Sequence, residues 1–130
     1  MNYLCINSSE SECYLSLWNQ DKPRTTMSWD AGRTLADEIF VKIDEVLAGS
    51  SCQYADLSGL VIYSGPGSFT GLRISHTVFN TLAYSLNIPI VGEVGDDWIR
   101  QGIMSLSTGK NDKIVLPIYG GKVNISKPKK

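Results

Sequence analysis

The sequence has few of the residues that metal and disulfide chemistry requires. His76 is the only histidine, and the three cysteines, Cys5, Cys13 and Cys52, are odd in number and form no C-x-x-C pair. Structural zinc sites and motifs such as H-E-x-x-H need more of these ligands at closer spacing. We therefore expect no metal site and no disulfide framework, and we interpret the cysteines as small core residues.

Long apolar runs are absent as well. No stretch approaches the roughly 18 to 20 apolar residues of a membrane span, and no basic segment leads into an apolar signal core at the N-terminus. With 42% hydrophobic and 19% charged residues the composition is globular, and 130 residues are the usual size of one domain. The sequence predicts a single soluble domain in the cytoplasm, with no membrane partner.

Acidic residues are scarce only near the C-terminus. The formal net charge is −1, but beyond residue 109 the only acid is Asp112. The lysines of this region are Lys110, Lys113, Lys122, Lys127, Lys129 and Lys130. A short lysine-rich end is typical of a solvated tail, although it adds nonspecific attraction to phosphates. We therefore predict a short basic tail over residues 109–130, and we do not expect a DNA-binding protein.

The apolar pattern predicts an α/β fold with a mixed sheet. Three short runs joined by turns predict an antiparallel meander, and apolar residues at three- and four-residue intervals predict a helix that Gly49 ends. A buried run, a glycine-rich turn and a second helix then predict a parallel crossover. The expected strands are 3–7, 14–18, 24–29, 57–63 and 88–91, with 114–116 as a candidate final strand. The expected helices are 34–47, a second that ends near residue 86, and 96–106.

Three glycines, Gly65, Gly67 and Gly71, follow the buried strand. Their spacing fits neither G-x-x-x-x-G-K-[ST] nor G-x-G-x-x-G, so neither nucleotide-binding motif is present. Two interpretations remain open: an anion site at a helix N-terminus, or a sharp turn that needs positive φ, with Ser68 or Thr70 as the N-cap. The sequence favours the turn.

The second helix is poor in charge. Arg73 and His76 are the only residues between Gly71 and Leu86 that can carry one. A helix with a solvent-exposed side normally has a charged face, so we expect this helix to be buried on two sides. The sheet covers one side and the first helix covers part of the other, which leaves room for a neighbouring helix or a partner protein. A lone helix histidine is more often packed than catalytic.

Five segments carry a more specific pattern. They are residues 4–9 (LCINSS), 13–17 (CYLSL), 43–47 (IDEVL), 64–74 (SGPGSFTGLRI) and 86–92 (LNIPIVG). Together they resemble the TsaB family, also called YeaZ, over roughly residues 3–92, and the glycine-loop segment is the most specific of them. The resemblance implies the N-terminal domain of the actin-like, sugar-kinase-like ATPase superfold, which is ribonuclease H-like, with a mixed five-stranded sheet.

The resemblance implies a noncatalytic scaffold in the machinery that makes threonylcarbamoyladenosine in tRNA. In that family the scaffold forms a heterodimer with a TsaD-like catalytic subunit through helices of the two N-terminal domains, and it recruits a TsaE-like ATPase. TsaD uses paired metal-binding histidines, whereas this chain has His76 alone. We therefore expect no enzymatic activity, no cofactor and at most weak or indirect binding of tRNA.

The chain also departs from the family pattern. Asn7 replaces a carboxylate that in active members organises metal and phosphate, and the usual His-Ser pair of the first helix is replaced near Leu35-Ala36. We expect the family's second domain to be absent, with residues 1–108 as a TsaB-like N-terminal domain. The resemblance implies two degenerate phosphate loops, Asn7, Ser8 and Ser9 in one and Gly65, Gly67 and Ser68 in the other. A nucleotide held at a partner interface stays open as an alternative.

The charge-poor second helix and the resemblance together place the partner surface on the outer sides of the first two helices. The expected contacts are Leu35, Ile39 and Ile43 on the first helix and Arg73, His76, Thr77, Asn80 and Tyr84 on the second. When the chain is alone, a second copy is expected to cover this patch and give a homodimer. Two other functions stay open: a nucleotide-binding enzyme of the same superfold and a peptidase-like protein.

Overall fold

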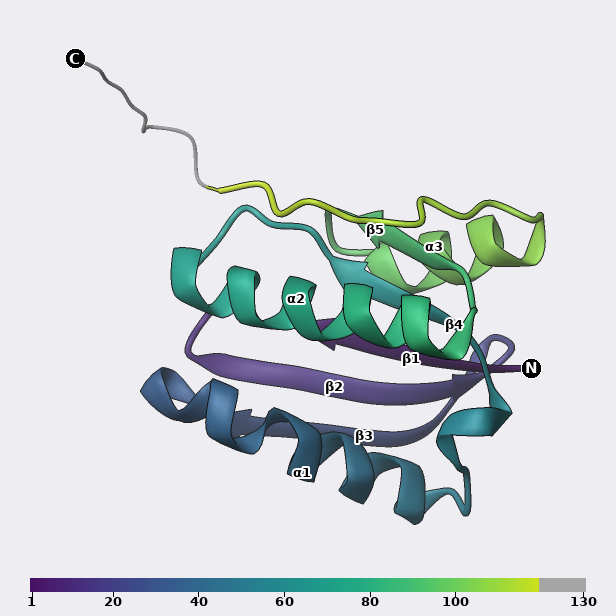
Figure 1. Cartoon of the computed structure of the whole chain (residues 1–130), viewed down its shortest axis with the longest axis horizontal. Coiled ribbons are helices and arrows are strands. Elements are labelled where there is room, and N and C mark those ends of the chain that lie inside the picture. The colour runs from purple at the N-terminus through teal and green to yellow at the C-terminus, as the bar shows by residue number, and fades with distance from the viewer. Residues whose placement is uncertain (120–130) are drawn as a thin grey trace.

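The computed structural model describes residues 1–119 and contains one mixed sheet with helices on both faces (Figure 1). The strands are β1 (Asn2–Asn7), β2 (Glu12–Asn19), β3 (Lys22–Asp30), β4 (Leu57–Tyr63) and β5 (Ile90–Glu93). The helices are α1 (Leu35–Gly49), α2 (Phe69–Leu86) and α3 (Trp98–Ser107), with 3-10 turns η1 (Gly32–Thr34) and η2 (Tyr54–Asp56). Within residues 1–119, none of the helices has the length and apolar content needed to cross a membrane. Lys122, Lys127, Lys129 and Lys130 lie outside the described residues.

The strands lie in the order β3-β2-β1-β4-β5. β1 pairs antiparallel with β2 and β2 with β3, whereas β4 pairs parallel with both β1 and β5. Parallel neighbours need a crossover connection, and α2 supplies the one between β4 and β5. The expected meander, parallel crossover and mixed five-stranded sheet are confirmed.

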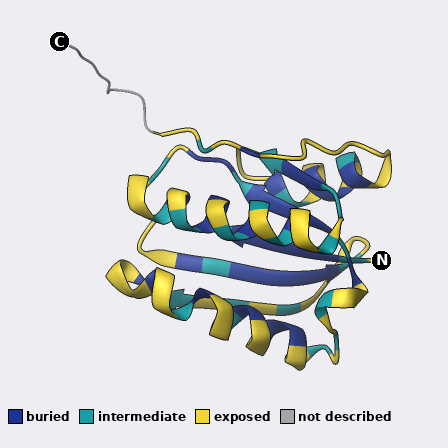
Figure 2. Ribbon diagram, viewed as in Figure 1, coloured by how far each residue is buried: buried dark blue, intermediate teal, exposed yellow. Residues whose placement is uncertain are grey.

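Alternation along the central strands sends apolar side chains to both faces of the sheet. Leu4 and Ile6 of β1 join the core under α1 and α2, whereas Tyr3 and Cys5 join the core under α3. This division follows because successive strand residues face opposite sides. Figure 2 shows the result: the central strands are buried, and the sides of α1 and α2 that face away from the sheet are largely exposed.

Residues 111–119, here called the strap, begin along the free edge of β5. The Ile90 N–H donates to the Asn111 Oδ1 at 3.1 Å, and the Gly92 N–H donates to the Asp112 Oδ2 at 3.1 Å. The Asp112 N–H donates back to the Ile90 carbonyl at 2.8 Å. The strap side chains therefore occupy backbone N–H groups of β5, which would otherwise be free to pair with a further strand.

The strap continues along α2 to the glycine loop. The Asn80 side chain donates to the Val115 carbonyl and accepts from the Val115 N–H, each at 2.9 Å, and the Ile118 N–H donates to the Ser64 carbonyl at 2.7 Å. The strand expected at 114–116 is therefore wrong, because Val115 bonds a helix side chain. Val115 is buried in the main core and anchors the strap there, whereas the other residues of 110–119 are exposed or half-buried, as a solvated segment would be.

Candidate partner-binding groove

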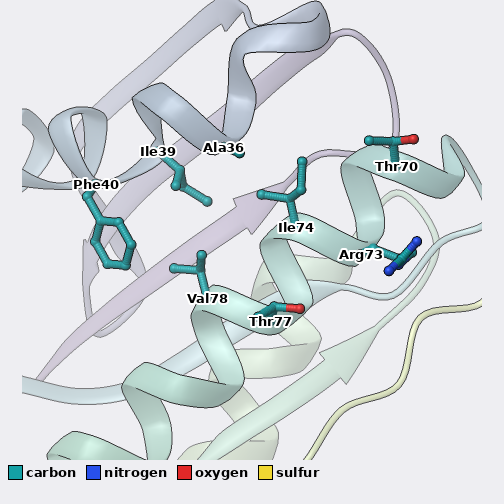
Figure 3. Close-up of a pocket in the computed structure, with 8 residues that line it drawn as sticks. All are labelled: Ala36, Ile39, Phe40, Thr70, Arg73, Ile74, Thr77 and Val78. Atoms are coloured by element: carbon teal, nitrogen blue, oxygen red, sulfur yellow. The ribbon is translucent and has the colours of Figure 1, made fainter.

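An apolar groove lies between the outer sides of α1 and α2 (Figure 3). Its volume is about 440 Å³, and its lining residues are Ala36, Ile39, Phe40, Thr70, Arg73, Ile74, Thr77 and Val78. In Figure 3, Ile39, Ile74 and Val78 project into the space between the two helices. Phe40 remains 50% exposed. An exposed apolar concavity of this kind is typical of an interaction site.

Helix geometry explains why the groove is apolar. Ala36 and Phe40 are four residues apart and share one side of α1, as Ile74 and Val78 share one side of α2. These positions lie beside the stripe of each helix that packs on the sheet. Each helix therefore has a second apolar strip, and the two strips line the same groove.

Several expected interface residues lie in the core instead. Leu35, Ile39 and Ile43 are at most 3% exposed and belong to the main core, and His76 is 3% exposed. Their placement on the outer sides of the helices is therefore wrong. The regular apolar spacing on which α1 was predicted marks its inner face, and only Ile39 reaches the floor of the groove.

The other expected contacts differ in their surroundings. Arg73 and Thr77 are exposed and line the groove, as predicted of an outer surface. Tyr84 is 90% exposed but lines a second concavity, which α2 forms with the strap. Asn80 is half-buried and bonded to the strap, so its amide is already occupied within the fold.

The sequence reasoning missed most of the groove lining. The missed residues are Ala36, Phe40, Thr70, Ile74 and Val78. The signal that could have revealed them is an apolar residue directly beside a buried stripe, at a position where a solvated helix would have a charge. Phe40, which follows the buried Ile39, has this character most clearly.

Arg73 brings the only formal charge to the groove lining. Its guanidinium carbon lies 5.1 Å from the centroid of the Phe69 ring, within the range of a cation–π contact. The Phe69 ring in turn contacts Tyr119 of the strap, with 4.5 Å between ring centroids. Within residues 1–119, no carboxylate forms a salt bridge with Arg73.

The two expected phosphate loops lie together and bond each other. The Ser68 N–H donates to the Ser9 carbonyl at 2.6 Å, and a Cβ on Gly67 would lie 2.4 Å from the Ser9 Cβ. Ser68 Oγ accepts from the Gly71 N–H at 3.2 Å and caps α2, and Ser8 Oγ lies 2.8 Å from the Gly71 carbonyl oxygen. The turn interpretation is confirmed, with Ser68 as the N-cap, and these N–H groups are used within the fold.

The remaining loop residues also have structural roles. Gly65 adopts a φ of 127°, a conformation that favours glycine, and a Cβ there would lie 2.1 Å from the Ile118 carbonyl oxygen. Asn7 Oδ1 accepts from the Ser9 N–H at 2.9 Å. Both residues therefore shape the contact among the two loops and the strap.

His76 and the buried cysteines are packed side chains. His76 Nδ1 lies 2.7 Å from the Leu72 carbonyl oxygen and donates to it, and Nε2 has no hydrogen-bond partner in the described chain. Burial lowers the pKa of His76, so the ring is neutral at neutral pH. Burial raises the pKa of the Cys13 thiol to about 12 and also raises that of Cys5, which disfavours either as a nucleophile. In residues 1–119, no three His, Cys, Asp or Glu side chains converge on a metal-sized site.

Comparison with known proteins adds a family to this geometry. A family model described as TsaD: tRNA N6-adenosine threonylcarbamoyltransferase matches residues 23–94. The tRNA threonylcarbamoyladenosine biosynthesis protein TsaB of Haemophilus influenzae is 30% identical over 91 residues, which cover 70% of this chain and 38% of that protein. The TsaB of Escherichia coli is 28% identical over 92 residues, covering 71% and 39%. The chain thus spans about two fifths of the length of these curated relatives.

A solved structure shares the fold. YeaZ from Pseudomonas aeruginosa has a TM-score of 0.67 and 22% identity, over 72% of this chain and 43% of that one. The actin-like fold class expected from the sequence is therefore confirmed. The region that the family model matches includes α1, β4, α2 and β5, and so contains both helices of the groove.

Proposed function

Because the chain belongs to the family of TsaD and TsaB (YeaZ) proteins, we propose that it is a noncatalytic scaffold subunit in tRNA threonylcarbamoyladenosine biosynthesis. The scaffold binds a TsaD-type catalytic subunit through the groove between α1 and α2. The observation that carries this proposal is the groove itself, which leaves Phe40 half exposed. Covering the groove removes apolar area from water, the main favourable term in most protein associations.

The lining of the groove suits a helix. Ala36 and Thr77 have small side chains, and Val78 is β-branched and short, so the backbone of a third helix can approach α1 and α2 closely. Two helices that already lie side by side on a sheet become part of a helical bundle when partner helices pack on them. This geometry supports a helix-to-helix contact with the catalytic subunit.

The family model is described as a transferase, which makes catalysis the second candidate function. Two features of this chain disfavour it. The only histidine, His76, is buried with its Nδ1 bonded to backbone, and Asn7 is occupied in a turn. We expect no ATPase, peptidase or transferase turnover from the chain alone. Turnover that Asn7→Ala or His76→Ala abolishes would instead support catalysis.

The experiment that tests the scaffold role is a calorimetric titration with the TsaD-type protein of the same source. The parent chain is expected to form a stable complex. Thr77→Glu puts a larger, charged side chain into the groove, four residues from Arg73, where its carboxylate can pair with the guanidinium within this chain. Because it fills the groove and occupies Arg73, it should lower the affinity about tenfold or more. Ser85→Glu adds the same charge to an exposed position of α2 outside the groove, and its affinity should stay within about twofold of the parent.

Circular dichroism of both variants serves as the folding control. If Thr77→Glu is folded and binds as tightly as the parent, the groove is not the partner surface. If the parent itself does not bind, the scaffold role is wrong.

The resemblance to TsaB leads us to propose two further properties. A TsaE-like ATPase is a second partner, and tRNA contacts the chain weakly or indirectly, with strong dependence on salt. Removal of residues 127–130 should weaken tRNA binding and leave the complex with the TsaD-type protein intact. A cytoplasmic location remains a prediction.

A further inference from the structure

Arg73 gives the groove a charge that the described chain does not neutralise. It is the only formally charged residue of α2, and the salt bridges of residues 1–119 are Lys42–Glu45, Arg100–Asp97 and Lys110–Asp112. Figure 3 shows its guanidinium on the side of α2 away from Phe40. A cation at the rim of an apolar groove attracts an anion on whatever fills the groove.

The acids of α1 are mostly engaged within the fold. Glu38 Oε1 accepts from the Trp29 Nε1 at 3.1 Å and from the Thr34 Oγ1 at 2.8 Å. Asp44 Oδ1 accepts from the Tyr54 hydroxyl at 2.9 Å, and Glu45 pairs with Lys42. None of these acids lines the groove, and neither does Asp37, the remaining acid of α1, which is exposed and is the α1 carboxylate that a second copy would offer to Arg73. The carboxylate that would complement Arg73 is therefore missing from the groove of this chain.

This imbalance distinguishes two occupants of the groove. In an isologous dimer the same patch faces itself, so two Arg73 side chains would enter the interface and the groove lining would supply no carboxylate. A helix of another chain can instead bring an acid to Arg73 and an apolar side to Ile74 and Val78. Electrostatic complementarity of this kind selects partners and disfavours wrong ones.

We propose that Arg73 makes the groove select an amphipathic helix of a different chain, one that bears an Asp or Glu opposite Arg73, over a second copy of this chain. The inference rests on the proposed scaffold function and names the chemistry that its partner must present. The homodimer expected of the chain alone is then the weaker of the two pairings.

The surroundings of Arg73 prepare it for this role. The guanidinium lies over Phe69, and Tyr119 supports the Phe69 ring from the strap. The Ile118 N–H fixes the neighbouring strap residue on the Ser64 carbonyl. A planar guanidinium that is already stacked loses less freedom when it binds a carboxylate, and lysine cannot reproduce this arrangement.

The test is a calorimetric titration of three variants with the TsaD-type protein of the same source. Arg73→Glu should weaken binding about 30-fold or more, and Arg73→Lys should weaken it by roughly three- to tenfold. Arg100→Glu is the matched control, because Arg100 is an exposed arginine on α3, on the other face of the sheet. Its affinity should remain within about twofold of the parent.

A second arm identifies the partner's carboxylate. Each exposed helical Asp or Glu of the TsaD-type protein is changed to Lys and titrated against Arg73→Glu. One such change should restore at least about tenfold of the lost affinity, because the swapped charges attract again. Thermal melting confirms that each variant is folded.

Several outcomes would overturn the inference. If Arg73→Glu binds the TsaD-type protein as tightly as the parent does, the scaffold role stands but Arg73 does not contribute to it. The same conclusion follows if no change in the partner restores the affinity of Arg73→Glu. Self-association as tight as partner binding, weakened by Arg73→Glu and restored by Asp37→Lys, would identify a second copy as the occupant. Loss of tRNA binding with unchanged partner affinity would show that Arg73 binds phosphate. If the parent does not bind the TsaD-type protein, the scaffold role fails and this inference fails with it.

Discussion

α1 and α2 cover the same face of the sheet, but their outer surfaces differ in chemistry. The charged residues of α1 are Asp37, Glu38, Lys42, Asp44 and Glu45. α2 has Arg73 as its only formal charge, beside a buried and neutral His76. Their inner faces are alike, because both bury aliphatic or aromatic side chains in one core. The inner face of each helix thus reflects the fold, whereas the outer face reflects what surrounds the helix.

Substitution of the inner faces should have the largest effect on stability. Phe79 of α2 and Ile43 of α1 are both 0% exposed. We expect Phe79→Ala to lower the free energy of unfolding by about 3–5 kcal/mol and Ile43→Ala by about 2–5 kcal/mol, because each leaves a cavity. Urea denaturation measures both. Tyr84→Ala, at a 90% exposed position of α2, should cost less than about 0.5 kcal/mol. A small effect at Phe79 would show that the inner faces are not equivalent.

Asn80→Ala should have the next largest effect, because α2 also holds the strap. The variant loses both hydrogen bonds to Val115 and leaves its backbone groups without those partners. We expect a loss of about 1–3 kcal/mol and faster hydrogen exchange of the Val115 N–H. Asn80→Asp keeps the acceptor and should slow that exchange relative to Asn80→Ala. Unchanged exchange in Asn80→Ala would show that other contacts hold the strap.

The buried His76 of α2 predicts that the stability of the protein depends on pH. Burial lowers its pKa in the folded chain, so the unfolded chain binds a proton first as the pH falls. The contribution of neutral His76 to the free energy of unfolding is therefore fully present above about pH 6.5. Below that pH it declines, by at most about 1.4 kcal/mol per pH unit. Urea midpoints from about pH 7.5 to 5.5 should fall for the parent and less for His76→Gln. If the urea midpoints of the parent and of His76→Gln fall equally with pH, His76 is not the cause of the pH dependence.

The outer charges of α1 should have the smallest effect. Lys42 Nζ lies 3.9 Å from a Glu45 carboxylate oxygen in a partly exposed pair and 5.6 Å from the Trp29 ring centroid. Such pairs contribute about 0.3–0.5 kcal/mol, so Lys42→Ala should cost less than about 1 kcal/mol. Thermal melting at low and high salt measures the change. A larger loss would mean that the outer face of α1 also has a structural role.

The strands and helices with strong apolar patterns could be predicted from sequence. The buried run at 57–63 matches β4, and the helix predicted after the glycine loop ends at Leu86, as expected. An apolar run marks the strand, and the glycine loop marks the boundary between the strand and the helix. β5 begins two residues later than predicted. The Ile88 N–H donates to the Ala83 carbonyl and belongs to the end of α2, where Asn87 has a φ of 55°. The apolar pattern could not separate such a helix end from the start of a strand.

The groove was harder to predict than the fold. The sequence places the apolar stripe of α1 on the partner surface, whereas Leu35 and Ile43 are buried in the main core. Which side of an amphipathic helix meets its own sheet depends on tertiary packing, and an apolar stripe identifies first the side that packs in the core. The strap could not be predicted either, because Asn80 and Val115 are 35 residues apart and their pairing has no local periodicity.

The two edges of the sheet are closed in different ways. At one edge, Asn111 and Asp112 occupy backbone donors of β5. At the other, β3 begins with Lys22, Pro23 and Arg24, and charges and proline on an edge strand discourage pairing with another chain. Unpaired edges are templates for fibrils. An apolar groove between two helices can therefore stay exposed in a crowded solution, because both edges of the sheet resist the addition of foreign strands.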